Sequence, residues 1–292
     1  MANPMKKTVV VILPILVSVL LSCASAHHEP FAGDTPVVRD LDALAAQLKA
    51  FCDESSLLSL EQAGQVTYDE FSAPVWVVRY RPPGAERRVL VTGGVHGNEP
   101  AGCAWVTELV RLLADRPQLY GNTSFDLVPL VNPWGWNRDI RYNREGWDIN
   151  RDFASFETQE ARILESLFDS RGYDLAIDHH EDPDARGFYL YQYAKRDTTL
   201  SRAVIEEMRK LGYPIEQDVH MVILRTRDGL IDAPGWGLRY MRLTGQLSIT
   251  NYLRLEHSRE VYTIETPIYL PMEDRLRMHR RAFELIYSGV VE

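Results

Sequence analysis

Cysteine is scarce in this chain, with three residues among 292. No Cys-x-x-Cys pair occurs, so the sequence suggests neither a thiolate metal cluster nor a thioredoxin-like redox site. The chain also lacks an excess of positive charge, because its formal net charge is -9. This charge disfavours nucleic acid as a partner. Internal repeats and low-complexity tracts are absent as well. What remains is an ordinary globular composition, with 45% hydrophobic and 25% charged residues.

Long hydrophobic runs are also missing, apart from Val9 to Leu21 near the N-terminus, which is too short to span a bilayer comfortably. Two lysines precede this run and small residues follow it, which predicts a secretory signal peptide over 1–26. Two cleavage sites for removal of this signal peptide are consistent with the sequence. Ala24-Ser25-Ala26 suits cleavage before His27, and Leu20-Leu21-Ser22-Cys23 resembles a bacterial lipobox. We therefore expect an exported protein in the periplasm or cell envelope, with membrane attachment through a lipidated Cys23 as one of the two routes.

The two other cysteines, Cys52 and Cys103, leave two alternatives open. They can pair in an oxidising compartment. Cys103 lies in an apolar stretch with helical periodicity, so a buried free thiol is an equally good interpretation.

Apolar segments with strand and helix periodicity alternate along the chain. Helices are expected over 41–51, 101–114, 158–170, 200–211 and 272–287, and strands over 75–80, 88–93, 125–131, 175–178, 187–193 and 261–266. A long loop is expected over 132–152, and 217–252 has no clear pattern. This alternation predicts an α/β fold with a mixed, mostly parallel sheet, in one domain over 39–292. Ligands bind beyond the carboxyl ends of the strands in such sheets.

Candidate metal ligands follow two of the expected strands. A glycine-rich turn after the strand at 88–93 carries His96-x-x-Glu99, and both side chains are good zinc ligands. A third ligand is needed, and His179 and His180 follow the apolar strand Leu175–Asp178. Side chains alternate along a strand, so Asp178 and His180 share a face. We choose His180, held by Asp178, and keep His179 as the alternative.

A polar loop and a buried glutamate complete the candidate site. The loop over 132–152 combines aromatic residues and glycines with Arg141, Asn150 and Arg151, and arginine binds carboxylates through two hydrogen bonds. Glu265 ends an apolar strand, where a carboxylate is costly to bury unless it is paired or used. It is therefore either a general base that takes a proton from water or a structural partner of an arginine.

Taken together, these motifs resemble the zinc carboxypeptidase superfamily, which also contains succinylglutamate desuccinylase and aspartoacylase. The resemblance runs from about Val89 to the C-terminus, some two-thirds of the chain, and rests on His96-x-x-Glu99, Asn132-Pro133, Gly146-x-Asp148-x-Asn150-Arg151, Asp178-His179-His180 and Thr263-Ile264-Glu265. It implies a three-layer α/β/α sandwich and one zinc ion, held by His96, Glu99 and His180.

The resemblance also implies a role for each remaining residue of the site. Arg141 would polarise the scissile carbonyl, Asn150 and Arg151 would bind the substrate carboxylate, and Asp148 would buttress the site. Glu265 would act as base and then as acid. Many peptidases of the group also carry a mobile tyrosine, for which Tyr240 and Tyr252 are available, and we take Tyr252 as the substrate-binding candidate. The residue that sets side-chain preference is expected near Thr250.

These expectations favour a zinc-dependent carboxypeptidase-type hydrolase acting on a peptide with a free terminal carboxylate. Only 27 residues follow Glu265, whereas the desuccinylase branch usually adds a β-rich domain there, and this favours the peptidase branch. An N-acyl amino-acid deacylase with the same site is the first alternative. The second is an inactive binding protein that keeps the pocket, although no ligand or base is missing.

Overall fold

A computed structural model of the chain describes residues 27–31, 35–168, 172–193, 197–217, 220–221 and 224–291. The predicted signal peptide over 1–26, including Cys23, lies outside the described residues. Among the described residues, none of the helices combines the length and the apolar character that a bilayer span requires.

An eight-stranded mixed sheet forms the centre of the molecule, in the order β1-β2-β4-β3-β5-β10-β6-β9. Its strands are β1 (Leu58–Tyr68), β2 (Phe71–Tyr80), β3 (Arg87–Gly93), β4 (Thr123–Val128), β5 (Tyr173–Asp182), β6 (Tyr189–Tyr193), β9 (Leu230–Ala233) and β10 (Ser258–Pro267). The four central strands β4, β3, β5 and β10 are parallel to one another. Antiparallel pairs flank them on both sides, at β2–β4 and β10–β6. The predicted α/β fold with a mixed sheet is confirmed.

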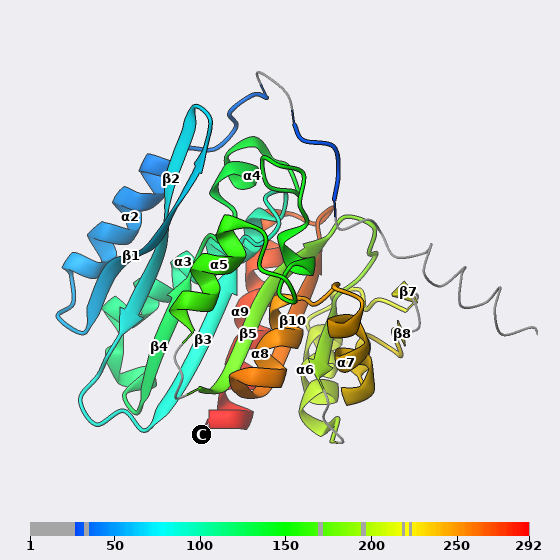
Figure 1. The fold of residues 1–292 in the computed structure, drawn as a ribbon. Helices are drawn as coiled ribbons and strands as arrows, with labels where there is room; N and C mark the ends of the chain where they lie inside the picture. The colour runs from blue at the N-terminus through cyan, green and yellow to red at the C-terminus, as the bar shows by residue number, and fades with distance from the viewer. Residues whose placement is uncertain are drawn as a thin grey trace, which may run out of the picture.

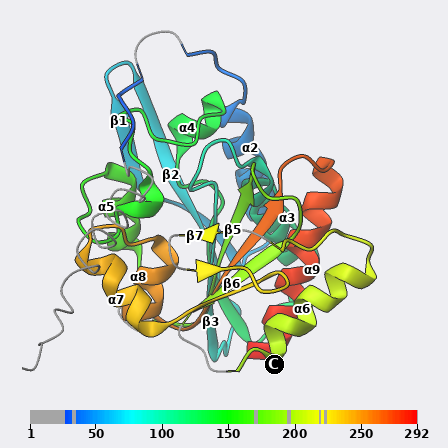
Figure 2. The same cartoon turned by 90° about the vertical axis from the view of Figure 1, so that its right-hand side faces the viewer.

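Helices cover both faces of this sheet and complete three layers (Figures 1 and 2). One layer holds α2 (Leu41–Asp53), α3 (Pro100–Asp115), α6 (Thr199–Lys210) and α9 (Met272–Val291), and the other holds α4 (Pro133–Arg138), α5 (Gln159–Leu167), α7 (Gly235–Leu243) and α8 (Ile249–Glu256). Two short 3-10 helices, η1 (Pro117–Tyr120) and η2 (Ile149–Arg151), and a separate hairpin of β7 (His220–Met221) and β8 (Leu224–Arg225) complete the elements.

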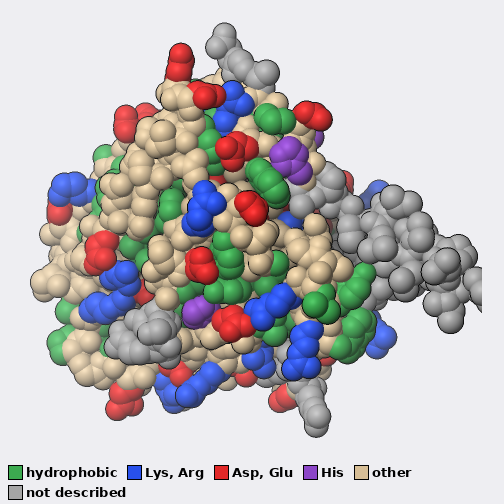
Figure 3. Space-filling view, viewed as in Figure 1, with side chains coloured by type: hydrophobic (Ala, Val, Ile, Leu, Met, Phe, Trp, Pro, Cys, Tyr) green, Lys and Arg blue, Asp and Glu red, His purple; other side chains and the backbone are tan. Residues whose placement is uncertain are grey.

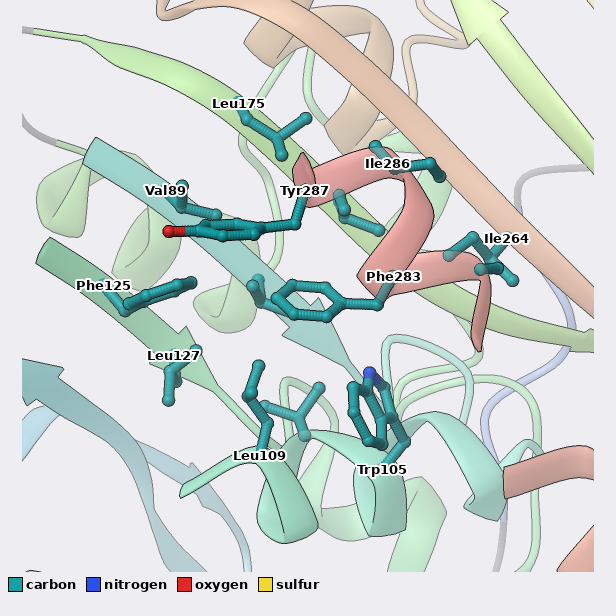
Figure 4. Close-up of a cluster of buried hydrophobic side chains, with 14 of the residues drawn as sticks. Val89, Trp105, Leu109, Phe125, Leu127, Leu175, Ile264, Phe283, Ile286 and Tyr287 are labelled. Atoms are coloured by element: carbon teal, nitrogen blue, oxygen red, sulfur yellow. The ribbon is translucent and has the colours of Figure 1, made fainter. Parts of the chain in front are cut away.

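Each face of the sheet has its own apolar core, because the strands contribute side chains to both faces. Figure 4 shows the first core, where Trp105 and Leu109 of α3 and Phe283 of α9 pack on the central strands. The second core joins the opposite face to α5, α7 and α8 through Leu164, Leu238 and Leu253. On the outer face seen in Figure 3, acidic and basic side chains are interspersed rather than gathered by sign.

The observed elements differ from the expected ones mainly at the edges of the sheet. Strand β1 was not predicted, and the unpatterned stretch 217–252 contains β7, β8, β9, α7 and the start of α8. The strand expected over 125–131 ends at Val128, and α4 and η2 interrupt the expected loop over 132–152. Both Cys52 and Cys103 are buried and free, so the thiol alternative is confirmed over the disulfide. Burial raises the pKa of Cys52 to about 11 and that of Cys103 to about 12.

Candidate metal centre

Two loop residues and one strand residue meet at the carboxyl end of the sheet. His96 lies in the turn after β3, Glu99 is the residue directly before α3, and His180 lies on β5. The turn opens with Gly94 at φ +62°, a left-handed conformation that favours glycine. Gly97, inside the His-x-x-Glu motif, has no space for a side chain, because a Cβ there would lie 2.0 Å from the carbonyl carbon of Gly135. The glycines therefore allow the turn to pack against the segment that carries Arg141.

These three side chains could hold a metal ion. Their ligand atoms all lie within 4.8 Å of one another, and all three residues are buried. Glu99 lies between the two imidazoles, with Oε1 2.6 Å from His96 Nδ1 and Oε2 2.6 Å from His180 Nδ1. Two histidines and one glutamate form a known ligand set of catalytic zinc, so the donor set fits such an ion.

Two further carboxylates bind the outer nitrogens of the same rings. Asp148 Oδ1 lies 3.1 Å from His96 Nε2, and Asp178 Oδ2 lies 2.7 Å from His180 Nε2. Thr92 in turn donates a hydrogen bond of 2.6 Å to Asp178. Carboxylates in this position fix the orientation and tautomer of a ligand histidine. Each ring therefore presents its Nδ1 to the centre of the group.

Electrostatics at this group favour positive charge at its centre. Burial alone would raise the pKa of Glu99, but the neighbouring His96 and His180 hold it well below its usual range. Burial opposes protonation of His180, yet the charges of Asp178 and Glu99 raise its pKa well above the ordinary value. Likewise, His96 and then Arg141 outweigh burial and lower the pKa of Asp148. A metal cation at the centre of the group would be attracted by the same carboxylates.

A cavity of about 400 Å³ opens directly onto the His-Glu-His group. Glu265 lines it from β10, opposite His180 of β5 in the parallel register. No hydrogen bond joins its carboxylate to another residue of the described chain. Burial raises the pKa of Glu265 well above its usual value; the charge of His180 opposes this rise, and those of Glu99 and Asp182 add to it. A carboxyl group with a raised pKa and no fixed partner is suited to accept and return a proton.

The loop residues singled out from the sequence also line this cavity. Arg141 donates to Asp148 at 2.9 Å and to Glu99 at 3.3 Å. Asn150 lies with Nδ2 3.3 Å from His180 Nε2, and its Oδ1 accepts a hydrogen bond from the backbone of α8. Arg151 donates to the carbonyl oxygen of Asn150 at 2.8 Å and forms no ion pair with any described carboxylate. A guanidinium at the cavity wall is thus left without an acidic partner in the part of the chain that the structure describes.

Two residues considered from the sequence lie elsewhere. The alternative ligand His179 faces the other side of β5, where its Nδ1 lies 3.0 Å from His279 Nδ1 and its ring packs against Trp105. Tyr252 does not line the cavity, because it lies on the far side of α8 among aromatic side chains, 5.2 Å from the ring centroid of Phe156. Tyr252 is therefore not in position to contact a substrate in this cavity, whereas Tyr240 of α7 does line it.

Sequence reasoning missed an aromatic wall of the cavity. Tyr189, Tyr191 and Tyr193 alternate along β6 and all line the cavity. Their period of two was visible in the sequence, but the strand alone does not show that this face meets the metal centre. Beside them, the Tyr193 and Thr263 hydroxyls lie 2.8 Å apart, and Thr250 donates to Tyr193 at 3.0 Å. Thr250, expected near the residue that sets side-chain preference, thus belongs to the cavity wall.

Comparison of the sequence with known proteins gives a match to a family model and matches to curated carboxypeptidases. Residues 85–222 match the model of the succinylglutamate desuccinylase/aspartoacylase catalytic domain. Carboxypeptidase 2 of Trichophyton tonsurans is 33% identical over 112 residues. That match covers 37% of this chain and 21% of the fungal protein, so the chain spans about a fifth of this relative.

Solved structures share the fold over most of the chain. A metallo-carboxypeptidase from Burkholderia cenocepacia superposes with a TM-score of 0.64 at 19% identity, covering 86% of this chain and 69% of that one. Carboxypeptidase A from Helicoverpa armigera gives a TM-score of 0.63 at 13% identity, over 95% and 79% of the two chains. The chain is thus similar to succinylglutamate desuccinylase/aspartoacylase catalytic domains over 85–222 and to a carboxypeptidase over 112 residues, and the predicted resemblance to this superfamily is confirmed.

Proposed function

We propose that this protein is a zinc-dependent hydrolase of the metallocarboxypeptidase type, which cleaves the C-terminal amide bond of a peptide. The observation that carries the proposal is the unpaired guanidinium of Arg151, in the cavity that also holds the His-Glu-His group and Glu265. A buried or half-buried arginine without an acidic partner is suited to bind a substrate carboxylate through two hydrogen bonds. A carboxylate bound beside a hydrolytic centre indicates a substrate whose free carboxylate lies next to the scissile amide bond, as it does at the C-terminus of a peptide.

The residues present fit one zinc ion. His96 and His180 would bind it through Nδ1 and Glu99 through its carboxylate, while Asp148 and Asp178 hold the outer ring nitrogens. When bound, such an ion polarises a carbonyl group and lowers the pKa of a water molecule. The histidine and carboxylate donors suit zinc, and among the described residues no cysteine belongs to this group of ligands.

Four residues of the chain would perform the remaining work. Arg151 and Asn150 bind the terminal carboxylate and thereby place the preceding amide bond at the metal centre. Arg141, already held by Asp148 and Glu99, directs its remaining N–H groups to the oxygen that gains charge. Glu265 takes a proton from the attacking water on its carboxylate and then donates it to the leaving amine nitrogen. Its lack of a hydrogen-bonded partner leaves the carboxylate free for this transfer.

A second candidate function is an N-acyl amino-acid deacylase, which would use the same groups on a smaller substrate. The match of residues 85–222 to the desuccinylase/aspartoacylase domain favours it. An inactive binding protein is a poorer explanation, because the three candidate ligands are all present and lie together, and His96, Glu99 and Glu265 line one cavity. For location, we propose export by the signal peptide over 1–26, with Cys23 as the site of a lipid anchor if the lipobox is used.

Hydrolysis by the zinc-loaded protein tests the proposal. A panel would contain free-carboxylate peptides, the same peptides with amidated C-termini, and N-acyl amino acids. We expect cleavage of the free acids and little cleavage of the amides. Rapid cleavage confined to the N-acyl amino acids would support the deacylase instead, and failure to cleave any member would favour the binding protein.

A further inference from the structure

The pairing of β5, β10 and β6 places residues at the cavity in three successive rows across the strands. The deep row contains Asp178, Thr263 and Tyr191. The metal row contains His180 and Glu265, two residues further along β5 and β10, and Tyr189, two residues earlier on the antiparallel β6. The outer row begins with Asp182, which pairs with Pro267 at the end of both strands. Successive rows are about 7 Å apart, since a strand rises about 3.3 Å per residue.

Asn150 and Arg151, the residues proposed to bind the substrate carboxylate, lie toward the deep row. Asn150 accepts a hydrogen bond of 3.0 Å from the backbone N–H of Ile249, at the start of α8. The next residue, Thr250, lies 3.3 Å from the hydroxyl of Thr263 in the deep row. A substrate whose terminal carboxylate is bound by Asn150 and Arg151 therefore extends from the deep row past the metal row. Its acyl side reaches the outer row.

The outer row presents one fixed negative charge to that part of the substrate. Asp182 lines the cavity and is only partly buried. Its Oδ1 accepts hydrogen bonds from the backbone of Asp184 and Ala185 at 2.8 and 3.2 Å, and its Oδ2 accepts one of 2.6 Å from the Tyr189 hydroxyl. These donors are neutral, and no described cation forms an ion pair with this carboxylate. Asp182 is thus held in place, with its charge left uncompensated.

We propose that Asp182 is a specificity-determining residue that binds an ammonium group on the acyl side of the scissile bond. This inference rests on the proposed carboxypeptidase function and names its substrate class: short peptides with a carboxylate at one end and an ammonium group near the other. An extended peptide spans about 3.3–3.6 Å per residue, so the ammonium group belongs to the first or second residue beyond the scissile bond. The Tyr189 ring beside Asp182 presents an aromatic face of the kind that also attracts a cation.

Two sources can supply this ammonium group, namely a free N-terminus or a basic side chain. Three substrates with one leaving residue separate them: Ala-Phe, N-acetyl-Ala-Phe and N-acetyl-Lys-Phe. Wild-type enzyme is expected to prefer Ala-Phe, N-acetyl-Lys-Phe or both over N-acetyl-Ala-Phe by about 10- to 100-fold in kcat/KM, the usual range for a hydrogen bond to a charged group. Faster cleavage of Ala-Phe would identify the free N-terminus as the bound ammonium group, and faster cleavage of N-acetyl-Lys-Phe would identify the basic side chain.

The matched variants are Asp182→Asn and Asp184→Asn. Asp182→Asn keeps the acceptor for the two backbone N–H groups but removes the charge, so the preference should fall to near unity. This preference is a ratio of kcat/KM values for two substrates, so it is insensitive to a change in Glu265 that affects both equally. Asp184→Asn changes an exposed carboxylate that also lines the cavity, and it should keep most of the preference if Asp182 is the determinant. Binding of Ala-Phe to Glu265→Gln protein, measured by calorimetry, should weaken to the same degree when Asp182→Asn is added.

Two results would overturn the assignment of Asp182. One is equal cleavage of the three substrates by the wild type, and the other is an unchanged preference in Asp182→Asn. Both differ from failure of the proposed function, in which none of the three free acids is cleaved and no dipeptide binds. That last outcome would overturn both proposals together.

Discussion

Asp178 and His180 lie on the same face of β5, and their side chains are in contact, with Oδ2 2.7 Å from Nε2. The other ring nitrogen of His180 lies 2.6 Å from Glu99. His96 shows the same division, with Asp148 at Nε2 and Glu99 at Nδ1. Each histidine therefore has one nitrogen fixed by a carboxylate and one directed to the centre, which is the arrangement of histidines that bind a metal.

Replacing Asp178 with asparagine should weaken zinc binding without abolishing it. The amide keeps the shape of the side chain but removes the charge that holds His180 and raises the basicity of its ring. Loss of such a partner typically costs about 10- to 100-fold in metal affinity. Competition with a chelator would measure the affinity, with Asp174→Asn, at the other end of β5, as the matched control. Equal zinc affinity in Asp178→Asn and wild type would show that Asp178 does not support a ligand.

Alanine at His180 and at His179 should have opposite effects on metal content. His180→Ala removes a ligand and should release most of the zinc, as measured by elemental analysis of the purified protein. His179→Ala should retain the zinc, because His179 faces His279 on the other side of the strand. It should instead lower the melting temperature, since a buried ring is lost from the first core. Zinc retained by His180→Ala and lost by His179→Ala would reverse the assignment.

Glu265→Gln should separate catalysis from stability. Loss of the proton acceptor should lower kcat by roughly 10²–10⁴-fold, the usual scale of general acid–base catalysis. The metal-free variant should nevertheless be more stable at neutral pH. The raised pKa of Glu265 means that folding favours its protonated form, so its contribution to stability is present at low pH and is lost as the pH rises. Thermal melts of both metal-free proteins at pH 4 and pH 7 would show a gap that widens at pH 7. A fully active Glu265→Gln enzyme would assign the base to another carboxylate.

Much of the site was predictable because its residues directly follow apolar strands. His96 follows β3, His180 ends the apolar run of β5, and Glu265 ends that of β10. Because ligands bind beyond the carboxyl ends of the strands in such sheets, all three residues are predicted to lie at one site. The order of strands in the sheet was not predictable from these patterns. Neither was Asp182 as a cavity residue, because nothing in the sequence shows that β6 returns antiparallel beside β10 and brings Tyr189 to it.

The errors have local physical causes. Strand β1 escaped notice because only Leu58, Val66 and Tyr68 of its eleven residues are buried, so an edge strand lacks an apolar pattern. In α7, one residue is buried and glycines interrupt the pattern. Tyr252 was misplaced because it lies two residues after Thr250 on α8, and residues two apart on a helix point to nearly opposite sides. Thr250 faces the cavity, so Tyr252 faces the aromatic cluster.

The proposed export of the protein can be tested at the N-terminus of the mature chain. The signal peptide pattern predicts that the mature protein begins at Cys23 or at His27. In the structure, His28 donates its backbone N–H to Gly146 at 2.6 Å, so either start would leave this contact in place. Mass spectrometry of the protein purified from the envelope of an expressing bacterium would identify the start and any attached lipid. A start at His27 would exclude the lipoprotein while supporting export, and an intact Met1 would exclude both.

Arg151 allows the sharpest test of the carboxypeptidase assignment. A guanidinium paired with the substrate carboxylate is a strong and directional contact, and the same pocket without that carboxylate leaves the charge unpaired. Breaking a buried charge pair costs about 3–5 kcal/mol, and a partly exposed one costs less. The wild type should therefore cleave a free-acid peptide much faster than its C-terminal amide. Arg151→Ala should remove most of this preference, and Arg151→Lys should restore only part of it, because lysine lacks the planar fork.

The competing interpretation assigns Arg151 a purely structural role in bracing its loop through Asp148 or Asp152. The structure gives those carboxylates other partners: Asp148 binds His96 and Arg141, and Asp152 accepts hydrogen bonds of 2.7 and 2.8 Å from Thr158. A bracing role predicts a lower melting temperature in Arg151→Ala and an unchanged ratio of acid to amide cleavage. A carboxylate-binding role predicts the reverse, a changed ratio with a small change in melting temperature. Measuring the ratio and the melting temperature in wild type, Arg151→Ala and Arg151→Lys therefore separates the two roles, and equal cleavage of acid and amide by the wild type would exclude a carboxypeptidase.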